Sequence, residues 1–227
     1  MIKKAIYLFI AGIISIMILS PAGAQVSTTG NTSSDQKKQK DFKFTVKINP
    51  LTALGGPFWV TIVPITGEYK LLLEAKLSKR ISFQAAGAYL GPSVLINLNK
   101  ITSDSSGVSS IKTSGYMFSG MVKFFLSRDL PAPKGFYVGP QVSYASAKIT
   151  DKSDPTGKNY LGATKLNLNA DIGYQLITSG GFCLDIFTGI GYVSRKWNVN
   201  GKTGIWSGIT DKTGVSIPLG LSFGYAF

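Results

Sequence analysis

The chain has 227 residues and a formal net charge of +13, with one cysteine and no histidine. This length fits one domain of ordinary size. The single Cys183 excludes an internal disulfide framework, and the lack of histidine excludes Ser-His-acid hydrolysis and His-ligated metal sites.

The first residues have the pattern of an export signal. Two lysines precede an apolar stretch from Ala5 to Leu19, and Pro21 and the small residues 22–24 follow it. The pattern predicts a signal peptide over residues 1–24. An uncleaved membrane helix is the alternative, but 15 apolar residues fall short of the roughly 20 that span a bilayer. Export makes nucleic acid the poorest partner for the positive charge, and no nucleic-acid partner is expected.

Residues 25–41 are rich in Ser, Thr, Gln and Lys, which predicts a flexible periplasmic leader. Regular alternation between large apolar and small or polar residues then begins, and it predicts one domain over residues 42–227. Eight segments carry the alternation: residues 42–49, 68–77, 81–89, 116–126, 136–145, 165–176, 182–195 and 214–227. A strict period of two is typical of strands with one apolar face. The predicted fold class is all-β, an eight-stranded antiparallel up-and-down transmembrane β-barrel.

Connections between these segments alternate in length. The short ones are residues 78–80, 127–134 and 179–181, and the long ones are residues 92–112, 148–160 and 196–212. Membrane barrels have short periplasmic turns and long outer loops, so this asymmetry orients the predicted barrel. The connection at residues 51–66 is too apolar for a solvated loop, and a ten-strand barrel remains open there.

Charged side chains fall on the face that the barrel would turn inward. The predicted lumen charge network is Lys43, Lys47, Glu68, Lys70, Glu74, Lys76, Lys123, Lys165, Asp171, Asp185 and Arg195. Asp171 and Asp185 could form a catalytic carboxylate pair, but ion pairs filling a narrow interior are the favoured interpretation. Cys183, Gly189 and Gly191 are interpreted as small fillers that relieve crowding. No catalytic residue, cofactor or metal is predicted, because no metal-ligand spacing, phosphate loop or nucleophile elbow occurs.

The last strand ends in the apolar row Leu221, Phe223, Tyr225 and Phe227. With the signal pattern, the alternation and the loop asymmetry, this row makes residues 42–227 resemble the small eight-stranded outer-membrane barrels of the OmpA type. The resemblance implies the bacterial outer membrane, contact with its lipid and lipopolysaccharide, and assembly by the barrel assembly machinery, which reads such a C-terminal row. OmpA-type proteins continue into a periplasmic peptidoglycan-binding domain. The sequence has none after Phe227, so wall anchoring is not expected.

Several functions remain open at this point. The first is a non-enzymatic, monomeric structural or surface-recognition protein that touches lipopolysaccharide phosphates or acidic glycans. Its outer loops would carry Lys100, Lys112, Lys148, Lys152, Lys158, Lys196 and Lys202. The others are a narrow channel for ions or small solutes, a lipid-modifying enzyme without histidine, and a secreted lipocalin-like carrier with the two faces reversed.

Overall fold

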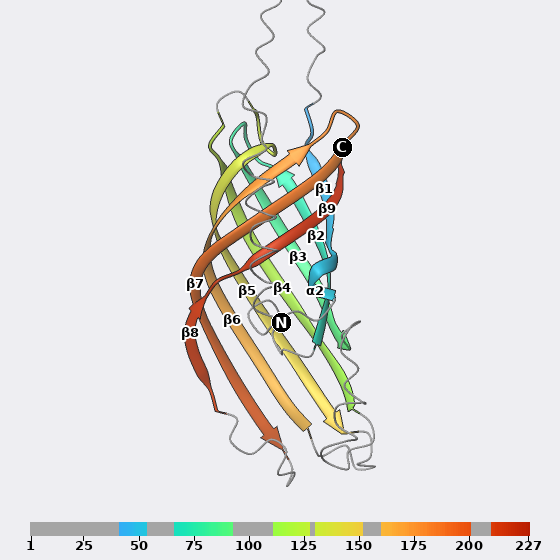
Figure 1. Ribbon diagram of the computed structural model, residues 1–227, viewed down its shortest axis with the longest axis vertical. Coiled ribbons are helices and arrows are strands. Elements are labelled where there is room, and N and C mark those ends of the chain that lie inside the picture. The colour runs from blue at the N-terminus through green and yellow to red at the C-terminus, as the bar shows by residue number, and fades with distance from the viewer. Residues whose placement is uncertain (1–40, 54–65, 93–110, 128–129, 152–159, 201–209) are drawn as a thin grey trace, which may run out of the picture. The chain divides into compact units, whose positions relative to one another are not determined.

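The structure is a computed structural model and describes residues 41–53, 66–92, 111–127, 130–151, 160–200 and 210–227. The predicted signal peptide, nearly all of the leader and residues 54–65 lie outside these ranges. Among the described residues, no helix is long and apolar enough to cross a membrane. The elements are β1 Phe44–Asn49, α2 Pro50–Ala53, β2 Thr66–Lys76, β3 Ile81–Pro92, β4 Ile111–Phe125, β5 Gly135–Asp151, β6 Tyr160–Ile177, β7 Phe182–Asn200, β8 Lys212–Ser216 and β9 Leu219–Ala226 (Figure 1).

The strands close into one ring. Neighbouring strands pair antiparallel from β1 to β7, and β9 joins β7 to β1. β8 and β9 keep one register against β7, with Ser216 opposite Gly191 and Leu219 opposite Thr188, so they are two parts of an eighth strand. Pro218 interrupts this strand because proline has no N–H for the ladder. The all-β, eight-stranded antiparallel barrel is confirmed. Among the described residues, the ring has eight strands, with β8 and β9 counted as one, and the ten-strand alternative finds no further strand.

The strands between the long connections extend further than the alternation predicts. β5 continues to Asp151 and β7 to Asn200. Each extended arm keeps its partner, as Leu161 opposite Val199 shows. The prediction stopped short because Ser, Thr, Asn and Lys in these ends are common loop residues, whereas a ladder needs only a partner strand.

A strict alternation over residues 42–49 predicts that Phe42 faces outward with Phe44 and that Lys43 faces the lumen, and both residues depart from it. The N–H groups of Lys43 and Phe44 both donate to the carbonyl of Phe227, at 2.9 and 3.0 Å, so the residue that follows β9 pairs with two residues here. Such a bulge shifts the alternation by one residue. Phe42 is therefore buried inside the barrel against Ile177 and Cys183, and Lys43 is exposed outside the lumen.

β1 is short, and the chain leaves the sheet where it ends. After Asn49 the chain forms α2, and the Thr52 hydroxyl lies 2.8 Å from the carbonyl oxygen of Glu68 on β2. Within the described ranges, β8 pairs with β7 alone. The ladder between β1 and β9 is consequently the shortest of those that close the ring.

Glycine on the inner face of β9 lets β1 approach closely. A Cβ added to Gly224 would lie 1.9 Å from the carbonyl oxygen of Val46 and 2.8 Å from Cγ of Lys47. No side chain fits at such distances, so only glycine allows Lys47 to fold across β9 into the lumen.

We predict that Gly224→Ala lowers the free energy of unfolding by at least about 2 kcal/mol, because overpacking costs about 1–3 kcal/mol. Gly214→Ala on β8 is the matched control, since nothing lies within 4 Å of its added Cβ. Its effect should stay within about 0.5 kcal/mol. Urea unfolding of the refolded barrel in detergent measures both, and equal losses would contradict the close contact at Gly224.

Candidate functional site

Four charged side chains meet inside the barrel, and we call them the charge cluster: Lys47, Glu74, Lys123 and Asp185. Lys47 Nζ lies 2.7 Å from Glu74 Oε2 and 2.6 Å from Asp185 Oδ2. Lys123 Nζ lies 3.3 Å and 2.7 Å from the same two oxygens. All four residues are at most 2% exposed. Each ammonium thus contacts both carboxylates, and the charge cluster is neutral.

Neutral side chains complete the shell of the charge cluster. Gln175 Oε1 accepts hydrogen bonds from Lys47 at 3.0 Å and from Lys123 at 2.7 Å. The Tyr137 hydroxyl donates to Asp185 Oδ1 at 2.6 Å, and its ring lies 4.3 Å from the Lys123 ammonium. Thr45 and Ser82 donate to Glu74. Together these residues come from β1 to β7, so bonded side chains cross the interior of a barrel that is only wide enough for side chains.

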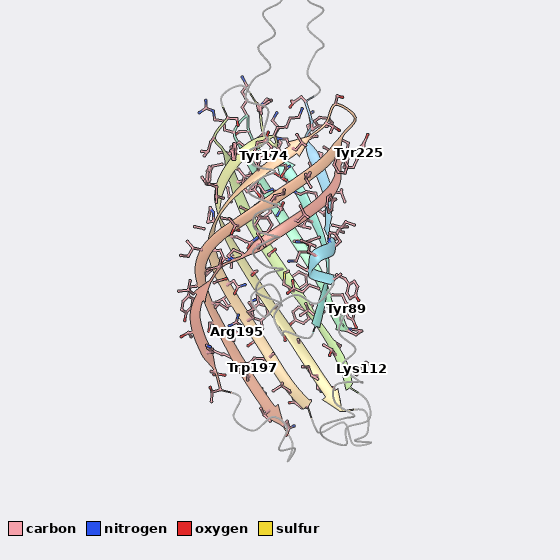
Figure 2. All side chains as sticks on the ribbon, in the orientation of Figure 1. Tyr89, Lys112, Tyr174, Arg195, Trp197 and Tyr225 are labelled. Carbon is pink, nitrogen blue, oxygen red and sulfur yellow. The ribbon has the colours of Figure 1, made fainter. Side chains whose placement is uncertain are left out.

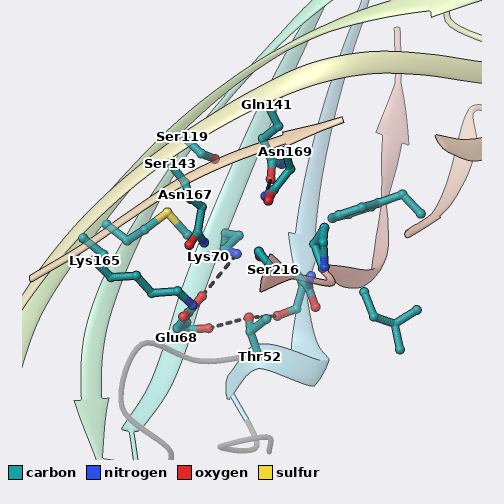
Figure 3. A pocket seen from close by; sticks show the side chains of 16 residues that line it. Thr52, Glu68, Lys70, Ser119, Gln141, Ser143, Lys165, Asn167, Asn169 and Ser216 are labelled. Atoms are coloured by element: carbon teal, nitrogen blue, oxygen red, sulfur yellow. Dashed lines mark hydrogen bonds and ion pairs between the residues drawn. The ribbon is translucent and has the colours of Figure 1, made fainter. Parts of the chain in front are cut away.

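A polar cavity of about 70 Å³ lies beside the level where β1 ends (Figure 3). Its polar lining is Asn49, Thr52, Glu68, Lys70, Ser119, Gln141, Ser143, Lys165, Asn167, Asn169 and Ser216. The Lys70 ammonium lies 3.2 Å from Glu68 Oε2. Met117 and Ala145 border the cavity and also belong to an apolar cluster of the inner wall with Leu90, Ile149 and Leu161. The inner wall therefore changes from charged through polar to apolar toward the long connections.

Positive charge exceeds negative charge around this cavity. Its lining has Lys70 and Lys165 against Glu68. Arg195 on β7 is the register partner of Lys165 and adds a third cation on the same face of the sheet. The charge cluster below is neutral. Asp171, two residues from Asn169 on the same face of β6, adds a second carboxylate, so three cations stand against two.

Several buried oxygens have no hydrogen-bond partner in the described part of the chain. They include Asn49 Oδ1, Asn167 Oδ1 and Asn169 Oδ1, which line the cavity, and both carboxylate oxygens of Asp171. A Cβ on Gly191 would lie 2.3 Å from Asn169 Oδ1, and one on Gly189 would lie 2.2 Å from Asp171 Oδ1. The two glycines therefore leave the space that these side chains occupy, as the sequence predicts.

The structure does not join Asp171 and Asp185 into a catalytic pair. Both oxygens of Asp185 are occupied by Lys47, Lys123 and Tyr137. Asp171 is 2% exposed and has no hydrogen-bond donor among the described residues. This arrangement offers no acid and base facing a common substrate position.

The remaining residues of the predicted network are placed separately. Lys76 lies at the short-turn end and pairs with Asp41. Lys43 faces outward and is the member of the predicted network that the structure removes from the lumen. Cys183 is fully buried with Phe42. The predicted network thus divides into the charge cluster, the cations and Glu68 around the cavity, Asp171, and a pair at the rim.

The outer face of the ring is apolar. Each of the eight strands carries large hydrophobic side chains that are between 39% and 71% exposed. Examples are Leu71, Phe118, Leu168 and Ile190. Tyr174 and Tyr225 lie at the end that carries the C-terminus, and Tyr89 lies nearer the other end (Figure 2). The row Leu221, Phe223, Tyr225 and Phe227 lies on this outer face, with the last two residues exposed.

Three of the lysines predicted in outer loops lie instead on strands. Lys112 on β4, Lys148 on β5 and Lys196 on β7 are exposed and project from the outer face. They stand four residues beyond Tyr116, Tyr144 and Tyr192 on the same strands and the same face, toward the long connections. We call these three lysines the basic band. Lys100, Lys152, Lys158 and Lys202 lie outside the described residues.

Comparison with known proteins adds no relative. No protein-family model matches this chain, and no curated protein matches it either.

We predict that Asp185→Ala lowers the free energy of unfolding by about 3–5 kcal/mol, because two buried ammoniums would then share one carboxylate. Asp41→Ala removes the partner of Lys76 at the rim, where the Asp41 side chain is 60% exposed. That control should change stability by less than about 1 kcal/mol. Urea unfolding followed by tryptophan fluorescence measures both variants. Similar small losses for the two would show that the charge cluster does not support the barrel.

Proposed function

We propose that this chain is a non-enzymatic integral outer-membrane barrel with a structural or surface-recognition role, and that its basic band contacts phosphate groups at the membrane surface. The observation that carries the proposal is the outer face, which is apolar around the closed ring and is followed by exposed lysines at one end. A closed sheet satisfies every backbone group without an edge, which is what hydrocarbon requires of a spanning sheet.

The distribution of charge supports a membrane barrel over a lipocalin-like carrier. A soluble carrier needs polar residues outside and an apolar ligand cavity inside. Here Lys47 and Lys123 are fully buried, whereas Phe118 is 61% and Ile190 64% exposed. The inner cavity is lined largely by amides, hydroxyls and charges, which suits neither a fatty nor an aromatic ligand.

The spacing of tyrosine and lysine supports recognition of phosphate. Tyrosine prefers the boundary between hydrocarbon and head groups, because one end of its side chain is apolar and the other polar. The basic band lies four residues beyond Tyr116, Tyr144 and Tyr192, toward the long connections. Its lysines would therefore reach the layer that holds the phosphates of lipopolysaccharide. Lys148 also lies 4.1 Å from the ring of Tyr160, which places its charge against the barrel wall.

The charge cluster argues against the channel alternative. Ion pairs at 2.6–2.7 Å link β1 to β2, β1 to β7 and, across the lumen, β4 to β7, and a permeating ion would have to break them. An enzymatic role finds no support in Asp171, which has no described partner that could act as its acid or base.

Cell fractionation tests the membrane assignment. We expect the full chain, expressed in a Gram-negative host, to sediment with outer membranes and to change its gel mobility when the sample is boiled. Recovery in the soluble periplasm, with the same mobility before and after boiling, would replace this proposal with a secreted carrier.

We predict that changing the basic band to glutamine, as Lys112→Gln, Lys148→Gln and Lys196→Gln together, weakens binding of the refolded barrel to lipid A vesicles by at least tenfold. Each lysine near an anionic surface contributes about 1 kcal/mol. The control changes Lys43, Lys79 and Arg80 to glutamine. These three residues are exposed near the short-turn end, and their replacement removes the same amount of charge. Binding should weaken as salt rises. Equal effects of the two triple variants would contradict a site at the basic band.

We also expect purified barrel in planar bilayers to give no discrete current steps, because the charge cluster crosses the lumen. Steady steps that shrink in Lys70→Gln, a variant of a cavity residue, would establish conduction and overturn the closed lumen.

A further inference from the structure

We propose that the polar cavity inside the barrel is a binding site for a hydroxyl-bearing oxyanion of the phosphate class. This site is separate from the basic band, which lies on the outer wall. The inference stands on the charge of the cavity, on its unpartnered acceptors and on its size.

The charge of the cavity selects an anion. Lys70 and Lys165 line it against one carboxylate, Glu68, and Arg195 lies opposite Lys165 in the β6–β7 register. A concave site of one sign enclosed by low-dielectric walls concentrates counter-ions of the other sign. A cation would meet this excess of positive charge, so a metal ion or an amine is disfavoured.

The acceptors of the cavity select an anion that can also donate. Asn49 is 4% and Asn169 is 6% exposed, both line the cavity, and the Oδ1 atom of each has no partner among the described residues. The Asn169 amide donates from Nδ2 to Gln141 Oε1 at 3.4 Å, and its Oδ1 lies over Gly191, where it has no donor among the described residues. A buried acceptor without a donor is costly, so a ligand O–H that satisfies it contributes to binding.

Phosphate meets both conditions near neutral pH, because it is charged and still carries an O–H. Sulfate has the same shape and two negative charges but no proton at this pH. A site that hydrogen-bonds a ligand hydroxyl rejects an isostere that lacks it. A comparison of phosphate with sulfate binding therefore separates the contribution of the asparagine oxygens from that of the lysines.

The size of the cavity is compatible with one such ion. It measures about 70 Å³. At about 30 Å³ for each water of the liquid, this is room for about two waters, which limits the ligand to a small ion such as phosphate. Around the cavity, Lys70, Lys165 and Arg195 exceed Glu68 and Asp171 by one charge, which the neutral charge cluster does not offset.

Calorimetric titration of the refolded full barrel, in a non-ionic detergent free of phosphate and at constant ionic strength, tests the proposal. Inorganic phosphate should bind at least tenfold more tightly than sulfate at neutral pH. Equal binding of the two anions, or no heat from either, would overturn the site and leave a cavity filled by water.

Two variants separate the parts of the site. Lys165→Gln should weaken both anions by at least tenfold, whereas Asn169→Leu should reduce phosphate to the affinity of sulfate. Lys112→Gln on the outer wall is the matched control and should leave both affinities unchanged. A loss in Lys112→Gln equal to that in Lys165→Gln would assign the binding to the surface and overturn the proposal. Lys165→Arg keeps the charge and should retain binding, so it replaces Lys165→Gln where that variant does not refold.

Free phosphate and the phosphate group of a lipid share this chemistry, and a second titration distinguishes them. Short-chain phosphatidic acid is added to the same detergent before inorganic phosphate. If the lipid competes, and Lys165→Gln weakens the competition, the phosphate of a lipid enters the cavity. If inorganic phosphate binds with unchanged affinity, the site takes the free ion. Both results support the site, and they differ only in the source of its ligand.

Discussion

A ring of eight strands encloses a space that only side chains can fill, and in this barrel the filling depends on two lysines that share two carboxylates. Neither ammonium could remain buried without the carboxylates, because an unpaired charge away from water is costly. The four side chains come from β1, β2, β4 and β7, so their ion pairs link strands that are not neighbours in the sheet. The division of the molecule into an ionic interior and an apolar exterior follows from this constraint.

The two faces then impose different chemistry on the same strands. On β7, Asp185 belongs to the charge cluster while Ile190 meets the surroundings on the opposite face. Polar function is therefore confined to three places: the interior, the strand ends and the connections. The cavity with Lys165 uses the first of these places, and the basic band with Lys196 uses the second. The cavity lies inside the barrel wall and the basic band lies on its outer face, so they can act independently.

The alternation predicts most of this arrangement because a period of two assigns a side to each residue once one is known. It placed Lys47 and Asp185 inward. It could not show that Gln175 and Tyr137 join them, since neutral groups are not distinctive until their neighbours in space are known. Phe42 was misplaced because the bulge depends on two N–H groups meeting one carbonyl of the last residue. Thr52 was missed for a similar reason, because its hydroxyl donates to the carbonyl of Glu68, sixteen positions away along the chain.

The short ladder between the first and last strands has a consequence for motion. Local opening begins where the fewest backbone hydrogen bonds must break. In this ring that place is the joint of β1 with β9, next to the interruption at Pro218. Amide protons there would exchange with solvent long before those of the long β5–β6–β7 meander. The ring would therefore open and reclose at this one seam while the other strands stay paired.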